Sequence, residues 1–224
     1  VLIGFVGFLD PPKKSAKEAI VALKKHGVDT VVLTGDSEGV AINVCKKVGI
    51  STKNSLTGKN IETMTDEELK EKSQICHLYS KLSPLQKQRI VRIYQEQGNT
   101  VGYMGDGIND SPPLKQADVG ISVDTAVDIA KETADIILLE KDLNVLETAV
   151  LTGRKTFTNI LKYLKMATSG NFGNMLSIII ACLFLPFLPM LPIHILIQNL
   201  LNDFAQIGMP FDNVDQEYLQ KPKK

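Results

Sequence analysis

Hydrophobic residues occur in short runs along the first two thirds of the chain, and these runs alternate with segments in which hydrophobic residues recur at helical spacing. The short runs predict strands at 1–9, 30–33, 75–79, 100–104, 119–123 and 136–139. The helical spacing predicts helices at about 15–25, 38–48, 84–97 and 127–132. Strands that alternate with helices in this way are typical of βαβ units around a parallel sheet.

Turn and capping residues mark where several of these elements begin and end. The Asp-Pro-Pro sequence at 10–12 closes the first strand, because proline cannot donate to a strand ladder. Asp36 or Ser37 is expected to cap the second helix. Residues 51–74 are mostly polar, so we expect them to be peripheral, with a short helix that opens at Thr65.

The pattern changes at residue 166, where a nearly unbroken apolar stretch begins and extends to about residue 201. The stretch is too long for one membrane span, and prolines interrupt it at 186, 189 and 192. We therefore expect a first span at 166–185, a proline-rich hairpin at 186–192 and a second span at 193–209. Each span is close to the roughly 17–25 residues that cross a bilayer. A signal anchor or a buried hairpin of core helices is the alternative.

The distribution of charge supports a membrane location for this stretch. Between Met166 and Met209, Asp203 is the only Asp, Glu, Lys or Arg residue. Basic residues flank the stretch on both sides, at positions 154, 155, 162, 165, 221, 223 and 224. Because positively charged flanks stay in the cytosol, both ends of the helical hairpin are predicted to be cytosolic.

The overall composition excludes little else. The chain has 25 basic and 25 acidic residues, so its net charge of zero gives no indication of a nucleic-acid partner. Cys45, Cys76 and Cys182 are far apart and lack CxxC spacing. We expect them to be reduced, buried thiols rather than disulfides or zinc ligands.

One face of the second predicted span carries four polar residues at helical spacing, Asn199, Asn202, Asp203 and Gln206. Ionisable residues within membrane spans are costly, and they commonly mark ion or substrate pathways. The first span adds Asn171 and Asn174, next to glycines that permit close helix approach. Oxygen ligands suit Mg²⁺ or Ca²⁺. The set predicts a cation site, whereas hydrogen bonding between the helices is the alternative for the asparagines.

The most informative polar segment follows the predicted strand at 100–104. It contains Asp106, Asn109 and Asp110 within the sequence MGDGIND. Mg²⁺ is usually held by one or two carboxylates together with substrate phosphates. The loop therefore predicts a site for Mg²⁺ and phosphate, although Asp, Asn and Gly also dominate turns that bind no ligand.

Two further segments are expected at the same edge of the sheet, because the carboxyl ends of parallel strands lie together. Thr34, Gly35 and Asp36 follow one strand, and Lys87 lies near the start of a helix. The Thr34 hydroxyl and the Gly35 amide can donate to phosphate oxygens, and Lys87 can neutralise their charge. A lone lysine on a helix is otherwise usually a solvated surface residue.

Three motifs in these segments resemble those of P-type ATPases: LTGD at 33–36, PLQK at 84–87 and MGDGIND at 104–110. The longer runs KYLKMATSGNFGNMLSIII and LPMLPIHILIQNLLNDFAQIGMPFD are similar to the bacterial magnesium-importing branch. The resemblance covers essentially the whole chain. It implies an aspartyl-phosphate pump that uses ATP and imports Mg²⁺.

The resemblance also implies roles for individual residues. Thr34, Gly35, Asp36 and Lys87 would contact the phosphoryl group. The set Asp106, Asn109 and Asp110 would hold the catalytic Mg²⁺, and the set Asn171, Asn199 and Asp203 falls at transport-site positions. The two spans would correspond to the fifth and sixth transmembrane helices of such a pump.

The chain departs from this family in what it lacks. No DKTGT motif, which carries the phosphorylated aspartate, occurs in the 224 residues. The nucleotide-binding domain, the actuator domain and the other membrane spans are also missing, so we expect this segment to be inactive by itself. Two alternatives stay open: a membrane-anchored phosphatase of the haloacid dehalogenase superfamily, and a non-catalytic product of a split or truncated pump gene.

The expected architecture is thus an α/β, haloacid-dehalogenase-like parallel-sheet domain followed by a transmembrane helical hairpin. We expect a partial phosphorylation domain at 1–152, a helical stalk at 153–165, the two spans within 166–209 and a cytosolic loop at 210–224. By the resemblance, the protein is a multi-pass protein of the bacterial inner membrane with its α/β domain in the cytosol. Its expected partners are membrane lipid, transported Mg²⁺ and the missing segments of the same pump, with no nucleic acid.

Overall fold

The structure is a computed structural model that describes residues 15–140 and 142–220. The strand predicted at 1–9 and the Asp-Pro-Pro turn at 10–12 lie outside the described residues. The chain divides into two compact units, the first ending at Glu147 and the second starting at Thr148. Each unit is described by itself.

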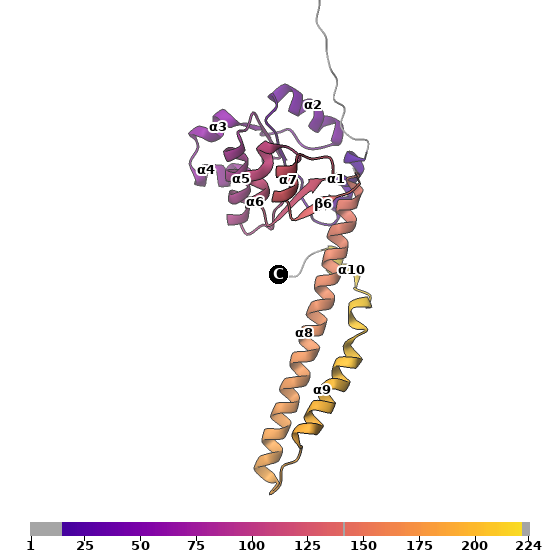
Figure 1. The fold of residues 1–224 in the computed structure, drawn as a ribbon. Coiled ribbons are helices and arrows are strands. Elements are labelled where there is room, and N and C mark those ends of the chain that lie inside the picture. Colours follow the sequence, from indigo (N-terminus) through magenta and orange to yellow (C-terminus); the bar gives the residue numbers. More distant parts are fainter. Residues whose placement is uncertain (1–14, 141, 221–224) are drawn as a thin grey trace, which may run out of the picture. The chain divides into compact units, whose positions relative to one another are not determined.

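The first unit contains two parallel three-stranded sheets (Figure 1). One sheet has the strand order β1 (Val32–Leu33), β3 (Leu78–Ser80), β2 (Leu56–Thr57). The other has the order β4 (Gly102–Met104), β5 (Val119–Val123), β6 (Ile136–Leu138). Leu33 lies opposite Tyr79, and Met104 lies opposite Ile121. The parallel α/β architecture predicted from the alternating pattern is confirmed.

Helices connect the strands, as crossovers between parallel strands require. In chain order they are α1 (Ala16–Lys25), α2 (Glu38–Val48), α3 (Gly58–Thr63), α4 (Asp66–Ser73), α5 (Pro84–Glu96), α6 (Ser111–Gln116) and α7 (Asp128–Thr133). A short 3₁₀ helix, η1 (Ile108–Asp110), precedes α6. Ser37 is the N-cap residue of α2, but its side chain makes no capping hydrogen bond.

Helix α5 begins where its sequence predicts. Ser83 and Gln86 form a capping box, in which each side chain bonds the other residue's backbone N–H, at 3.3 and 2.9 Å. Pro84 takes the first helical position, where no N–H is needed. This start fixes the register of α5, so that Lys87, together with the apolar residues Ile90, Val91 and Ile93, faces the interior.

Leu33 connects two hydrophobic clusters of the first unit. It packs against a cluster around Tyr79 and Ile90, and also against one that contains Val91 and Tyr103. Tyr79 is completely buried, and Ile90 and Val91 are almost so. Because β1 contributes to both clusters, the loop that follows β1 is held on a rigid base.

The prediction that residues 51–74 are peripheral was wrong. This segment forms β2, α3 and α4, and both Ile61 and Leu69 are completely buried in the cluster around Tyr79. The many charged residues of α4 obscured this, because a helix needs only one apolar residue per turn to reach a core. Strand β3 also lies later than the predicted 75–79, since Ile75 is 58% exposed.

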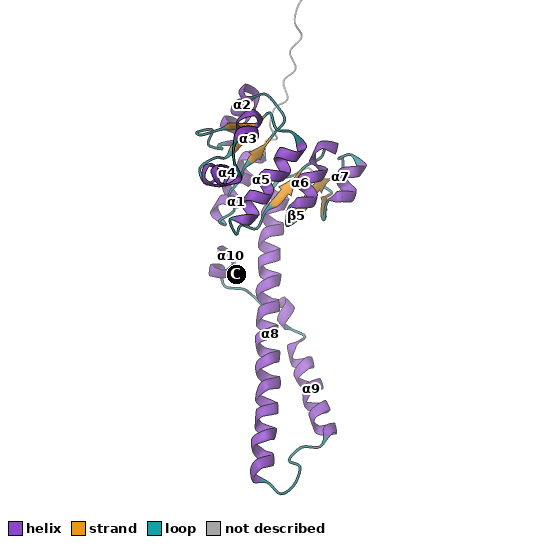
Figure 2. Cartoon of the chain, turned by 90° about the vertical axis from the view of Figure 1, so that its left-hand side faces the viewer, coloured by secondary structure: helices purple, strands orange, loops and turns teal. Residues whose placement is uncertain are grey.

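The second unit is a helical hairpin (Figure 2). Helix α8 (Asn144–Phe184) begins at the end of the first unit and runs without interruption for 41 residues, and α9 (Pro192–Gln206) returns beside it. A 3₁₀ turn, η2 (Met209–Phe211), and α10 (Gln216–Gln220) follow. The predicted stalk and first span are thus one helix. The second helix ends at Gln206, earlier than the predicted span at 193–209.

Among the described residues, α8 is the one helix that is both long and apolar enough to cross a membrane. Large apolar side chains along the hairpin are exposed, including Phe172, Leu183, Phe184 and Leu196. Cys45 and Cys76 are buried as expected, but Cys182 on α8 is exposed, in contrast to the prediction. This exposed apolar surface is typical of a segment that lies in lipid.

The segment after α9 is fastened to α8 within the second unit. The Lys162 ammonium group lies 2.8 Å from a carboxylate oxygen of Asp212 and donates to the carbonyl of Asn213. Arg154 donates to the carbonyl of Leu219 at 2.7 Å. The chain after α9 therefore returns along the amino-terminal half of α8.

Candidate functional site

The loop after β1 is hydrogen bonded to the loop after β3. The backbone N–H of Leu82 donates to the carbonyl of Thr34 at 3.0 Å, and that of Lys81 donates to the carbonyl of Asp36 at 2.9 Å. The Thr34 hydroxyl oxygen accepts from the Asp36 N–H at 3.1 Å. Its hydrogen therefore stays available for a ligand, and Gly35 and Asp36 are exposed beside it.

Lys87 lies in the first turn of α5, and its ammonium nitrogen is 2.7 Å from Oδ1 of Asp110. Tyr103 also donates to Oδ1, at 2.8 Å, and the Gly107 N–H donates to Oδ2 at 3.2 Å. Burial favours the neutral form of the Asp110 carboxyl, but the bonds from Lys87 and Tyr103 outweigh it, so the pKa of Asp110 lies below its usual value. Burial and the nearby Asp110 charge raise the pKa of Tyr103, which remains a neutral donor.

These contacts show how Asp110, which was expected to hold Mg²⁺ together with Asp106 and Asn109, is itself held. Its two oxygens accept three hydrogen bonds from protein donors, so it also positions Lys87. Sequence reasoning missed Tyr103, because a tyrosine in a strand gives no indication that its hydroxyl reaches the following loop.

The loop after β4 depends on a close approach at Gly105. A Cβ atom there would lie 2.4 Å from Cβ of Asp110, closer than such atoms approach, so only glycine leaves room for that side chain. The Ser122 hydroxyl donates to the Gly105 carbonyl at 3.0 Å, and the Val127 N–H donates to the Asp106 carbonyl at 3.1 Å. The backbone on both sides of Asp106 is thereby fixed.

Asp106 and Asn109 are exposed at this edge of the first unit. An exposed carboxylate beside an amide oxygen is a suitable donor pair for Mg²⁺, which takes oxygen ligands and retains water. Within the described part of the chain, no three His, Cys, Asp or Glu side chains are grouped as a metal site would require.

The structure thus brings some of the predicted residues together directly. Lys87 contacts Asp110, and the carbonyl of Thr34 bonds the loop that leads into α5. Thr34, Lys87 and Asp106 each follow the carboxyl end of a parallel strand, namely β1, β3 and β4. No hydrogen bond joins Thr34 to Asp106 among the described residues.

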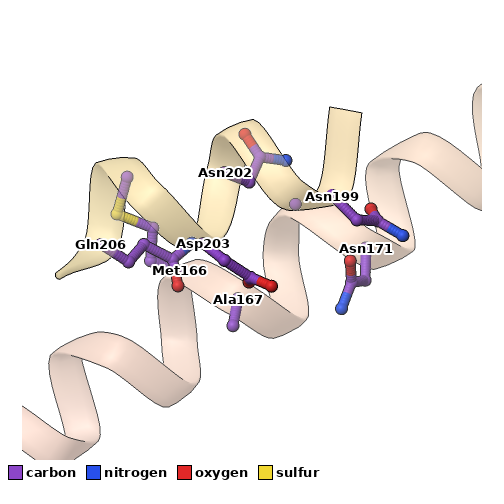
Figure 3. A pocket seen from close by; sticks show the side chains of 8 residues that line it. Met166, Ala167, Asn171, Asn199, Asn202, Asp203 and Gln206 are labelled. Atoms are coloured by element: carbon purple, nitrogen blue, oxygen red, sulfur yellow. The ribbon is translucent and has the colours of Figure 1, made fainter. Parts of the chain in front are cut away.

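The second unit contains a cavity of about 270 Å³ between α8 and α9 (Figure 3). Asn171, Asn199 and Asp203 all line it, as do Asn202 and Gln206, which belong to the polar face predicted from the helical spacing. Figure 3 shows Asp203 of α9 and Asn171 of α8 extending into the space between the helices. Asn174 lies outside this cavity and accepts a hydrogen bond from Gln198 at 2.9 Å, so it holds the helices together.

Comparisons with known proteins agree with this architecture. A family model described as "haloacid dehalogenase-like hydrolase" matches residues 2–118. The chain is 55% identical over 224 residues to "Magnesium-transporting ATPase, P-type 1" of Escherichia coli strain K12, a match that covers 100% of this chain and 25% of that protein. It is 54% identical over 224 residues to the protein of the same name from Salmonella typhimurium strain 14028s, with the same coverage.

A solved structure extends the likeness to both units. A zinc-transporting PIB-type ATPase in the E2.Pi state aligns with 90% of this chain and 27% of its own, with a TM-score of 0.62 and 24% identity. At that identity the match shows the fold alone. The chain spans about a quarter of the length of the curated relatives it matches. Because the matching family model covers more than half of the chain and the parallel α/β fold agrees with it, the chain belongs to the haloacid dehalogenase-like hydrolase family.

Proposed function

We propose that this chain forms part of a magnesium-importing P-type ATPase, comprising the phosphate-binding part of its phosphorylation domain and two of its membrane helices. The observation that carries the proposal is the 55% identity to a magnesium-transporting ATPase along the entire chain. That match includes both the Lys87–Asp110 edge of the first unit and the oxygen-lined cavity of the second. A phosphatase of the same superfamily would need the first but not the second.

In the soluble unit, each polar residue has a role at a phosphoryl group that ATP supplies to an aspartate outside this chain. The Thr34 hydroxyl and the Gly35 N–H donate to phosphate oxygens, with Asp36 closing the turn. Lys87 has three N–H donors, so it can neutralise phosphate charge while Asp110 holds one of them. Mg²⁺ held by Asp106, with Asn109 beside it, would offset the developing negative charge.

In the membrane unit, Asn171, Asn199 and Asp203 supply oxygen ligands to the transported Mg²⁺. A single carboxylate with amide oxygens provides charge without the thiolate or imidazole ligands that softer metals prefer. The basic residues on both sides of the hairpin support a cytosolic location for its ends. The protein would then be a multi-pass protein of the bacterial inner membrane, in contact with lipid.

The remaining parts of the pump complete the reaction. A nucleotide-binding domain, an actuator domain and further membrane helices supply the ATP site, the hydrolysis step and the other walls of the ion path. They are proposed as partners because the chain spans about a quarter of its relatives. We also propose the domain division given above, with a stalk at 153–165 and a cytosolic loop at 210–224.

The test uses the full-length pump in membrane vesicles. Asp106→Asn should abolish the acid-stable phosphoenzyme formed from labelled ATP, because the catalytic Mg²⁺ loses its carboxylate. Asp203→Asn should abolish Mg²⁺ uptake while labelled inorganic phosphate still phosphorylates the enzyme. Asp128→Asn and Ser177→Ala, which alter exposed side chains outside both sites, serve as matched controls.

Two results would contradict the proposal. Wild-type Mg²⁺ uptake by the Asp203→Asn variant would show that Asp203 does not form the ion site. Normal phosphoenzyme levels in the Asp106→Asn variant would show that Asp106 does not form the phosphoryl site.

A further inference from the structure

A second cavity of about 520 Å³ lies beside the first within the membrane unit. The second cavity is lined in part by Thr156, Asn159 and Tyr163 of α8, which do not line the first cavity. Asp203 and Gln206 of α9 line both cavities. The two spaces therefore share a wall that contains Asp203, the one Asp or Glu residue between Met166 and Met209. Thr156 and Tyr163 add hydroxyl groups to the second cavity.

Two buried amide oxygens lining the second cavity lack a donor. Asn159 is 4% exposed and Gln206 is 8% exposed, and neither Asn159 Oδ1 nor Gln206 Oε1 has a hydrogen-bond partner in the described chain. The orientation of the Asn159 amide is fixed, because its Nδ2 donates to the carbonyls of Pro210 and Asp212 at 3.2 and 3.1 Å. Its oxygen must therefore point away from those carbonyls.

Buried carbonyl oxygens without a donor are uncommon in native proteins, and they usually indicate a bound water or ion. Among the described residues no donor reaches either of these two oxygens, so an occupant that carries hydrogen atoms would satisfy both. Waters bound to a divalent cation are strong donors, and Mg²⁺ in particular retains several of them. Six waters at about 30 Å³ each occupy about 180 Å³, which fits within the second cavity.

We propose that the second cavity is a binding site for a hydrated divalent cation. Its coordinated waters donate to Asn159 Oδ1 and Gln206 Oε1, and Asp203 provides the balancing negative charge. The site rests on the proposed function, because it extends the same ion path. Its position beside Asp203 lets an ion pass between a hydrated state in the second cavity and direct ligation by Asp203 in the first.

The binding test uses the full chain in detergent micelles, with ¹⁵N in its asparagine side-chain amides and Mn²⁺ as a paramagnetic probe. The Asn159 amide signal should broaden as Mn²⁺ is added and recover when excess Mg²⁺ competes. The Asn144 amide, at the amino end of the same helix, should stay sharp, because it lies about 22 Å away along the axis.

A matched pair of substitutions tests the ligands. Gln206→Met removes an unpartnered oxygen at nearly constant volume, and it should raise the Mn²⁺ concentration for half-maximal broadening of Asn159 by about ten- to a hundredfold. Gln216→Met makes the same change at an exposed position of α10 outside both cavities and should leave that concentration unchanged.

The outcomes separate this site from the transport site. The proposal would be overturned if Mn²⁺ did not broaden the Asn159 signal, or if Gln206→Met and the wild type needed the same Mn²⁺ concentration for half-maximal broadening. The second cavity would then hold water without a cation. Failure of the proposed function would instead appear as wild-type Mg²⁺ uptake by the Asp203→Asn pump, while Gln206→Met still shifts the Mn²⁺ concentration that broadens Asn159.

Discussion

The Lys87 ammonium nitrogen lies 2.7 Å from Oδ1 of Asp110, and both side chains are largely enclosed, with exposed fractions of 10% and 14%. The pair joins the first turn of α5 to the loop after β4. Tyr103 and Gly107 donate to the same carboxylate, so Asp110 is held from three sides. An enclosed pair of this kind serves as much to position Lys87 as to stabilise the fold.

Removing one member of the Lys87–Asp110 pair should lower the free energy of unfolding. Lys87→Met leaves the Asp110 charge without its cation, and breaking such a pair typically costs about 3–5 kcal/mol. Urea unfolding followed by tyrosine fluorescence measures the change, since the chain has no tryptophan. The double variant Lys87→Met/Asp110→Asn should recover part of the loss. Lys115→Met, on the exposed side of α6, should change the free energy by less than about 0.5 kcal/mol. Equal effects of Lys87→Met and Lys115→Met would refute the structural role of the pair.

The same pair predicts a dependence on pH. The pKa of Asp110 is lowered in the folded state, so its stabilising contribution is fully present above the unfolded value of about 3.9 and is lost as the pH falls through the folded value. At pH 7, Asp110→Asn should therefore unfold more readily than the wild type, and the difference should shrink below about pH 4. Unfolding free energies at pH 7, 5 and 3 measure this. A difference that stays constant over that range would show that Asp110 titrates normally.

Gly102, in strand β4, and Gly105, in the loop that follows it, should respond differently to substitution by alanine. Gly105→Ala places a Cβ atom 2.4 Å from that of Asp110, and it should cost about 1–3 kcal/mol because the loop or the carboxylate must move. Gly102→Ala meets only ordinary contacts at 3.9 and 4.0 Å. Thermal unfolding should therefore show a large loss for the first variant and little change for the second. The reverse order would mean that the loop relaxes freely.

This close approach illustrates what the sequence could predict and what it could not. The GDG sequence after an apolar run identified the loop and its edge of the sheet, because glycine, aspartate and strand ends follow local rules. Which acidic residue faces a ligand and which faces Lys87 depends on the fold around Tyr103, β4 and η1. Asp106 and Asp110 look alike in sequence, and only packing distinguishes them.

Arg89 should contribute more to the free energy of unfolding than Arg92, which lies one turn later on the same helix. Arg89 bonds Asp66 and also donates to the carbonyls of Ile61 and Met64, whereas Arg92 is half exposed. The hydrogen bond from Arg89 lowers the pKa of Asp66. Arg89→Lys should therefore cost about 1–3 kcal/mol, because lysine cannot reach all these acceptors at once.

The matched change Arg92→Lys should cost less than about 0.5 kcal/mol. Chemical denaturation of the two variants compares them directly. Similar losses for both would show that α3 and α4 are not anchored through Arg89.

The purified chain should not become phosphorylated. Its 224 residues contain no DKTGT sequence, and the pair at the Lys87 edge offers no replacement nucleophile, because Asp110 is already bonded by three donors. Incubation with labelled ATP followed by acid precipitation should show no incorporated label, with a full-length pump as the positive control. Label on this chain would reveal a nucleophile that these residues do not indicate.

The helical hairpin of the second unit also combines features that the local sequence predicts with features that it does not. Charge depletion and prolines located the turn between α8 and α9, since both are local features. The continuity of α8 from Asn144 and the end of α9 at Gln206 depend on packing between the helices and on the segment that Asn159 and Lys162 hold. The second cavity could not be predicted, because it requires residues from both helices and from the chain that follows them.

Helix α9 has 15 residues, so at about 1.5 Å per residue it measures about 22 Å, shorter than a hydrocarbon core of about 30 Å. Asp203 lies in its final turn. A short helix is accommodated by local thinning of the bilayer, and this mismatch has an energetic cost. In the proposed pump, acyl-chain length thus sets how far the bilayer must thin around α9, and thicker membranes raise the energetic cost of that thinning.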